Sequence, residues 1–137
     1  MSTPAPYGAW PSPIDARLTA AHDGRPESVA HLGDDLWWTA PRPAEGGRRT
    51  LVRRRPDGTE ESVLPAPWNV RSRVVEYGGQ PWAGAPGPDG PLVVFVHFAD
   101  QRLYAYEPDR PGAEPRPLTP LSGVGGGLRW VDPVVHA

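Results

Sequence analysis

The stretch "FADQRLYAYEPDRPGAEPRPLTP", residues 98–120, joins an apolar end, a polar turn, an alternating segment and a proline-rich close. Most of it, "LYAYEPDRPGAEPRPLTP" at 103–120, follows the same plan as "LVRRRPDGTEESVLP" at 51–65. Both run from a strand-like segment through a Pro-Asp turn and a glutamate to a short segment closed by leucine and proline. The repeat distance is 52 residues, from Leu51 to Leu103, and periods near 50 with four strands each are typical of β-propeller blades. The alternative interpretation is two unrelated hairpins that share a common turn.

Short segments rich in β-branched and aromatic residues, separated by glycine and proline, predict eight strands joined as antiparallel meanders. We expect strands at 28–32, 36–41, 49–54 and 59–64 in a first blade, residues 28–67, and at 80–85, 92–98, 103–106 and 114–120 in a second blade, residues 68–120. The segment "LVVFVHF" at 92–98 is apolar almost throughout, which indicates burial on both faces.

The two ends of the chain carry less of this pattern. Residues 1–27 form an N-terminal segment with one expected helix at 13–21, capped by Ser12 and carrying Ile14 and Leu18 on one apolar stripe that packs on something larger. Residues 121–137 are expected to connect to a third blade, with a strand-like "LRWV" at 128–131. The expected fold class is therefore all-β: a partial β-propeller of about two four-stranded antiparallel blades plus a short N-terminal helix.

Repeat units bury their faces against neighbouring units, so two blades and a fraction cannot close a ring. We expect the chain to be the opening part of a longer protein.

Composition narrows the function classes. The 137 residues include 20 Pro, 16 Gly, six Trp and no Cys, and the net charge is −2. The aromatic content argues against disorder. The slightly negative net charge does not favour binding to nucleic acid or to an anionic membrane. The lack of Cys removes disulfides and thiolate metal sites and suits a reducing compartment. With no secretory signal pattern and no apolar run of about 20 residues, we expect a cytoplasmic protein without membrane or nucleic-acid partners.

Four phrases in order along the chain carry a family resemblance: "YGAWPSPI" at 7–14, "RSRVVEYGG" at 71–79, "FADQRLY" at 98–104 and "RPLTP" at 116–120. Together they resemble the N-terminal β-propeller of prolyl oligopeptidase-family serine peptidases, in the dipeptidyl aminopeptidase and acylaminoacyl-peptidase-like branch. The resemblance implies a propeller that gates the access of short peptides to an α/β-hydrolase domain with a Ser, Asp and His triad. The partners it implies are the remaining propeller blades and that hydrolase domain, and both are absent from these 137 residues.

The chain itself lacks the pattern of a catalytic centre. None of its serines lies in the G-x-S-x-G pattern of a nucleophile elbow, and no histidines share metal-ligand spacing. We therefore expect no peptidase activity from the chain alone, no cofactor and no metal. The resemblance implies serine-type exopeptidase activity in the parent enzyme. We interpret His97 as a hydrogen-bonded structural residue, and the arginine-rich run at 48–55 as a solvated sheet edge.

The candidate substrate-facing residues are Arg73, Glu76 and Tyr77 in "RSRVVEYGG". A carboxylate such as Glu76 can bind the free amine of a peptide through a charge-assisted hydrogen bond. The alternative, which the sequence favours, is a local ion pair of Glu76 with Arg71 or Arg73.

Two other functions remain open at this stage. The chain can be a binding module that assembles with copies of itself to complete a propeller ring. It can also be a small self-contained β domain with a structural role.

Overall fold

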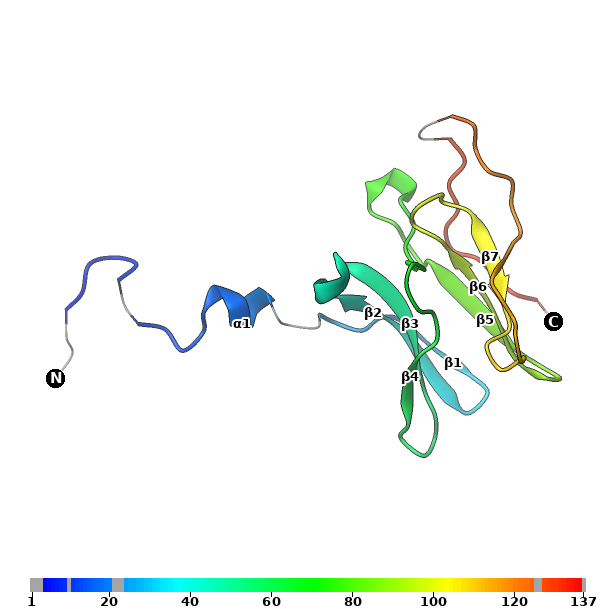
Figure 1. Ribbon diagram of the computed structural model, residues 1–137, viewed down its shortest axis with the longest axis horizontal. Helices are drawn as coiled ribbons and strands as arrows, with labels where there is room; N and C mark the ends of the chain where they lie inside the picture. Colours follow the sequence, from blue (N-terminus) through cyan, green and yellow to red (C-terminus); the bar gives the residue numbers. More distant parts are fainter. Residues whose placement is uncertain (1–3, 10, 21–23, 125–126, 137) are drawn as a thin grey trace.

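Two four-stranded antiparallel sheets make up most of the protein (Figure 1). The computed structural model describes residues 4–9, 11–20, 24–124 and 127–136. The first sheet holds β1 (Glu27–Leu32), β2 (Asp35–Arg42), β3 (Arg48–Arg54) and β4 (Glu60–Ser62), and the second holds β5 (Trp82–Gly87), β6 (Gly90–Val96), β7 (Leu103–Tyr106) and β8 (Arg116–Pro117). Within each sheet the spatial order follows the sequence, so each sheet is a meander. The expected all-β fold with two antiparallel four-stranded units is confirmed.

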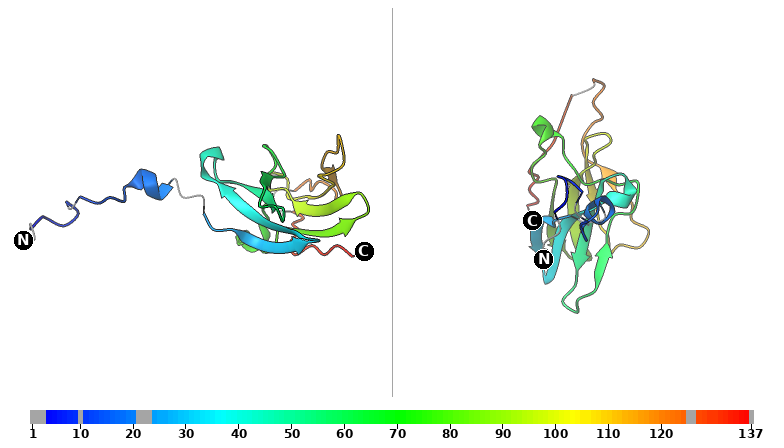
Figure 2. Two further views of the ribbon diagram at one scale, coloured as in Figure 1. Left: turned by 90° about the horizontal axis from the view of Figure 1, so that it is seen from below. Right: turned by 90° about the vertical axis from the view of Figure 1, so that its left-hand side faces the viewer.

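The two sheets are separate and pack face to face, as Figure 2 shows from two further directions. Their closest approach is between β1 and β5, the first strand of each sheet. Among the described residues no strand belongs to both sheets, which distinguishes the arrangement from a single barrel. Neighbouring meanders that meet at their first strands are consistent with adjacent blades of a propeller.

One hydrophobic core lies between the sheets. Its fully buried members include Trp37 and Leu51 from the first sheet and Trp82, Val93 and Phe95 from the second. The rings of Trp37 and Trp82 lie 6.2 Å apart between centroids. Burial of such large aromatic side chains supplies most of the energy that holds one sheet on the other.

Close contact between the sheets depends on the absence of a side chain at Gly84 in β5. A Cβ atom at this position would lie 2.5 Å from Cδ1 of Leu32 in β1. Nearby, the indole N–H of Trp82 donates a hydrogen bond of 2.9 Å to the carbonyl of Ser28. The first strands can therefore approach closely while the polar atom of the tryptophan remains satisfied.

Strand β6 is buried on its core face and only partly covered on the opposite face. Val93 and Phe95 are fully buried in the core, whereas on the opposite face Leu92 and Val94 are half-buried and Val96, at the end of the strand, is fully buried. The alternation and the strand register place only apolar side chains of β5, β6 and β7 on this outer face: Ala83, Ala85, Leu92, Val94, Val96, Leu103 and Ala105. The apolar character of "LVVFVHF" thus reflects one face in the core and a second face that is only partly covered.

Two arginines of the run at 48–55 are buried, so the expected solvated edge is wrong for them. Arg53 is 8% exposed and reaches across the sheets, with Asp35 at 2.6 Å and Asp109 at 2.6 Å. Its guanidinium also lies 5.2 Å from the centre of the Trp37 ring. Burial alone would lower the pKa of Arg53, and the hydrogen bonds to Asp109 and Asp35 more than reverse this effect. A charged group is tolerated here because it is fully paired.

The second buried arginine, Arg48, ties the first sheet to the connection that follows it. Its guanidinium donates hydrogen bonds to the carbonyls of Leu64 at 3.1 Å and Trp68 at 2.9 Å. It also pairs with Glu45 at 2.6 Å. Arg48 is therefore an internal anchor and not a surface charge.

The N-terminal helix begins later than expected, and its described residues do not pack on the sheets. Helix α1 spans Ala16–Ala20, and residue 21, the expected end, lies outside the described residues. Asp15 caps it instead of Ser12, since Asp15 Oδ1 accepts the backbone N–H of Leu18 at 2.7 Å. Ile14 and Leu18 are exposed, and Figure 1 shows this segment extending away from the sheets.

The C-terminal segment lies beside the second sheet without forming the strand expected at 128–131. Asp132 and Gln80 exchange two hydrogen bonds, each 2.8 Å long, just before β5 begins. Farther along, Val135 and His136 line a cavity with residues of β5 and β6. The segment therefore follows β5 on the side of the second sheet away from the core.

None of the helices in the described parts of the chain is long and apolar enough to span a lipid bilayer.

Candidate functional site

Four connections gather at one end of the sheets, which we call the loop end. They are 43–47, 71–79, 97–102 and the described parts of 121–129, whereas the opposite end carries the short turns at 33–34, 55–59 and 88–89 and the longer connection at 107–115. Loops on a rigid scaffold are where binding residues concentrate. The candidate residues Arg73, Glu76 and Tyr77 all lie in one of these connections, residues 71–79, which we call the η2 loop after its 3₁₀ helix η2 (Val74–Glu76).

The η2 loop holds an unusual backbone conformation. Val75 has φ of 45° and Glu76 has φ of 61°, both in the left-handed region that non-glycine residues, and β-branched ones above all, rarely adopt. Such conformations cost of order 1–3 kcal/mol each and persist only where the surroundings enforce them.

Contacts with the C-terminal segment enforce this conformation. The Ser72 hydroxyl donates a hydrogen bond of 2.6 Å to the carbonyl of Trp130. Gly79 lies directly against the side chain of Val131, where any Cβ atom would clash. Both ends of the loop are thereby held by residues more than fifty positions later in the chain.

The tip of the η2 loop points into solvent. Val75 is 81% exposed and Tyr77 is 97% exposed, and the side chain of Glu76 is 66% exposed between them. A rigid base with an exposed apolar, acidic and aromatic tip is suited to contact a ligand or a second protein surface.

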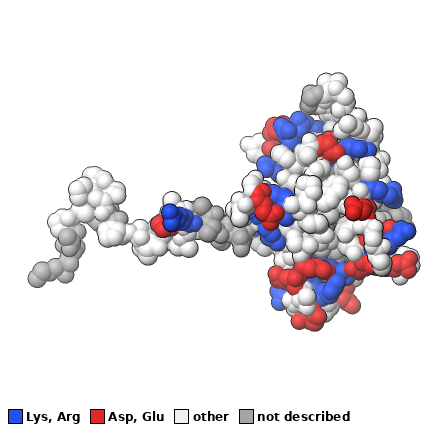
Figure 3. Space-filling model, in the orientation of Figure 1, with Lys and Arg blue, Asp and Glu red and all other residues white. Residues whose placement is uncertain are grey.

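Glu76 bridges two arginines. One of its carboxylate oxygens lies 3.4 Å from Nε of Arg73, and the other lies 3.5 Å from Nη2 of Arg129. Figure 3 shows basic and acidic side chains side by side over this upper part of the sheets. The expected pair with Arg73 is present, and Arg71 instead lies over the ring of Phe98 at 5.1 Å.

Arg129 was missed by sequence reasoning. It follows a glycine-rich stretch that reads as a simple connection, and no local spacing links it to Glu76. The signal that could have identified it is its place beside Trp130 at the expected start of a third unit.

His97 is a structural residue, as expected. Its Nδ1 accepts the backbone N–H of Asn69 at 3.2 Å, and the Trp68 ring packs edge-on at 4.9 Å. Burial lowers the pKa of His97, while the charge of Asp100 acts in the opposite direction. The imidazole is therefore held neutral, with Nδ1 as the acceptor.

This environment predicts a loss of stability in mild acid. Because the pKa of His97 is lower in the folded than in the unfolded chain, the unfolded chain takes up the proton first as the pH falls. The free energy of unfolding should fall as the pH drops below about 6.5, the ordinary histidine value. Denaturant unfolding at a series of pH values, compared for the unmodified chain and His97→Gln, should show this component only in the former. His31→Gln, at an exposed strand position, is the control and should retain it.

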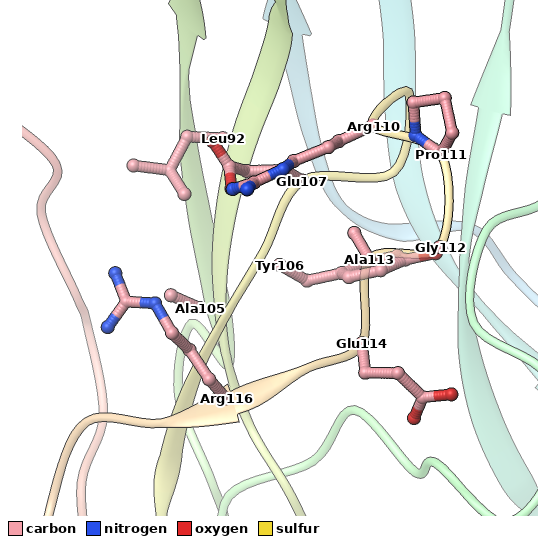
Figure 4. A pocket seen from close by; sticks show the side chains of 10 residues that line it. All are labelled: Leu92, Ala105, Tyr106, Glu107, Arg110, Pro111, Gly112, Ala113, Glu114 and Arg116. Carbon is pink, nitrogen blue, oxygen red and sulfur yellow. The ribbon is translucent and has the colours of Figure 1, made fainter.

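A cavity of about 260 Å³ at the opposite end of the second sheet is a weaker candidate (Figure 4). The charges that line it include Glu107 and Arg110, which pair with each other at 3.1 Å. In Figure 4 Arg116 points away from Glu114. The cavity thus brings together no set of converging groups.

Comparisons with known proteins were made by sequence and by structure. Neither the protein-family models nor the curated proteins compared contain a match to this chain. Among solved structures, a puromycin hydrolase is 70% identical with a TM-score of 0.90, over 98% of this chain and 21% of that one. A mutant of puromycin hydrolase complexed with PGG is 71% identical with a TM-score of 0.89, over 96% and 20% of the two chains. A puromycin-hydrolyzing peptidase of Mycobacterium tuberculosis is 43% identical with a TM-score of 0.86, over 96% and 20%.

The chain is similar to the N-terminal part of puromycin-hydrolysing peptidases. It spans about one fifth of the length of these proteins. The similarity supports the resemblance to the N-terminal propeller of a prolyl oligopeptidase-family peptidase and does not distinguish a branch of that family.

Proposed function

We propose that the chain forms the opening blades of the propeller of a serine peptidase that hydrolyses puromycin and short peptides. The observation that carries the proposal is 70% identity to a puromycin hydrolase over 98% of this chain. Residues 28–67 and 68–120 are the first two blades, residues 1–27 precede them, and residues 121–137 lead into a third. The chain has no catalytic activity alone, since the nucleophile and its partners belong to a hydrolase domain outside it.

In this proposal the propeller gates the access of substrates, and the loop end faces them. Support comes from the η2 loop, whose rigid base presents Glu76 and Tyr77 at an exposed tip. The enzyme acts as an exopeptidase of the dipeptidyl aminopeptidase or acylaminoacyl-peptidase type, in the cytoplasm. The lack of Cys among 137 residues supports a reducing compartment.

The self-assembling binding module is not favoured. The chain matches about one fifth of single longer chains, so the remaining blades are supplied more simply by the same polypeptide than by further copies.

A chimera tests the proposed function. The corresponding fifth of puromycin hydrolase is replaced by this chain, and puromycin hydrolysis is measured for the chimera and for the 137-residue chain alone. We expect the chimera to hydrolyse puromycin and the chain alone to be inactive. A chimera that folds but does not hydrolyse puromycin, or an active isolated chain, contradicts the proposal.

Within the chimera, Glu76→Gln should weaken the binding of substrates that carry a free α-amine. Loss of one charge-assisted hydrogen bond to the amine should raise KM roughly tenfold with a smaller effect on kcat. An N-acetylated peptide with the same sequence should show no such change. The control is Glu60→Gln, which removes an exposed carboxylate on β4 that lies 4.0 Å from Arg54 of β3. If Glu76→Gln changes the KM of the free and the acetylated peptide equally, Glu76 does not bind the substrate amine.

A further inference from the structure

A cavity of about 310 Å³ lies beside the η2 loop at the loop end. Residues that line it include Arg73, Ala99, Asp100, Leu121, Leu128 and Arg129. The arginines and Asp100 form a charged wall, whereas Leu121 and Leu128 are 66% and 51% exposed and form an apolar wall. Its volume is in the range of small-molecule sites.

The donors of the charged wall are not saturated. The side chain of Arg129 is only 20% exposed, and its buried Nη1 has no hydrogen-bond partner among the described residues. The contacts of Glu76 with Arg73 and Arg129, at 3.4 and 3.5 Å, are longer than the roughly 2.7–2.9 Å of a strong charge-assisted hydrogen bond. This Nη1 is shielded from solvent, so the donors that face a ligand in the cavity are the other guanidinium atoms of Arg129 and the guanidinium of Arg73, whose side chain is 43% exposed.

The acidic groups near the cavity are already engaged. Asp100 accepts hydrogen bonds from the Tyr104 hydroxyl at 2.6 Å and from the backbone N–H of Arg102 at 3.1 Å. Glu76 stands at the rim with its side chain 66% exposed. Arg71 lies outside the cavity, over the ring of Phe98 that Arg73 also contacts, and its positive charge adds to the field of the two lining arginines, which favours an added anion.

We propose that this cavity binds a carboxylate carried by an apolar residue, as at the C-terminus of a short peptide. Guanidinium donors match the two oxygens of a carboxylate, and the leucines cover the apolar group attached to it. The site goes beyond the proposed function, since binding here requires neither hydrolysis nor any residue outside the chain.

The test uses the 137-residue chain labelled with ¹⁵N and three probes: N-acetyl-leucine, its neutral amide N-acetyl-leucinamide, and inorganic phosphate. Titrations are followed by the backbone amide signals of Ala99, Leu128 and Arg129 and by the Nε–H signal of Arg129. We expect saturable shifts with N-acetyl-leucine and affinity at least roughly tenfold weaker for the amide, because the amide lacks the charge. Phosphate is expected to bind more weakly than N-acetyl-leucine, because it makes no contact with the leucines.

Arg129→Gln should reduce the affinity for N-acetyl-leucine roughly tenfold, whereas Arg110→Gln, an exposed arginine paired with Glu107, should leave it unchanged. Circular dichroism checks that each variant is folded, and Arg73→Gln replaces Arg129→Gln if the latter is not. Equal affinity for acid and amide, tighter binding of phosphate, or no saturable shift would each overturn the proposal. These outcomes do not depend on the chimera, so the two proposals can fail separately.

Discussion

Replacing Trp82 with alanine is expected to lower the free energy of unfolding by about 3–5 kcal/mol, the cost of removing a large aromatic side chain from a closed core. Trp82 is fully buried, and its ring packs 6.2 Å from that of Trp37 in the opposite sheet. Its N–H also satisfies the carbonyl of Ser28, which the variant leaves without this donor. Urea unfolding followed by far-UV circular dichroism measures the loss without relying on tryptophan fluorescence.

Trp38→Ala is the matched control. Trp38 follows Trp37 in β2, so it points to the outer face of the first sheet, where it is half-buried. We expect it to cost less than about 2 kcal/mol, since part of its surface is already in water. Similar losses for Trp38 and Trp82 would show that the core between the sheets does not provide the main stabilisation.

The second large effect is expected at Arg53. Arg53→Met removes the cation that pairs with Asp35 and Asp109, and the side chain of Asp35 is only 14% exposed. Stranding a buried carboxylate costs about 3–5 kcal/mol, and the partial exposure of Asp109 places the expected loss at the lower end of that range. The same urea unfolding experiment measures it.

A double variant separates the effect of losing the Arg53 guanidinium from the effect of leaving the buried Asp35 carboxylate unpaired. Adding Asp35→Asn to Arg53→Met should recover much of the stability, because methionine fills the space and no buried charge remains unpaired near it. Arg54→Met, at a position 54% exposed in its side chain, should change the free energy of unfolding by less than about 0.5 kcal/mol. If the double variant is no more stable than Arg53→Met, the penalty does not arise from Asp35.

The strands were predictable because their signals are local. Turn residues such as Gly33 and Gly58 and the alternating segments between them locate all eight strands within a few residues. The burial of Arg53 was not predictable in this way. Its partner Asp109 lies 56 positions later and approaches only because the two sheets pack together.

In the candidate site, too, the local contact was predictable from the sequence and the long-range contact was not. The pair of Arg73 with Glu76 is local, at three residues' spacing, and was foreseen as the alternative to substrate contact. The second arginine, Arg129, reaches Glu76 only through the path of the C-terminal segment. The start of the helix was expected too early for a different reason: Ser12 and Asp15 are both good caps, and Asp15 forms the bond to Leu18.

The dependence of the η2 loop on Trp130 and Val131 also sets an order of events during biosynthesis. The first sheet can form as soon as β4 has left the ribosome, because all its strand partners are by then available. The η2 loop has support from Gln101, whose Oε1 accepts the backbone N–H of Arg73 at 2.7 Å, but its contacts with Trp130 and Val131 come last. The exposed tip therefore gains its full set of contacts only after translation has passed residue 131, later than either sheet.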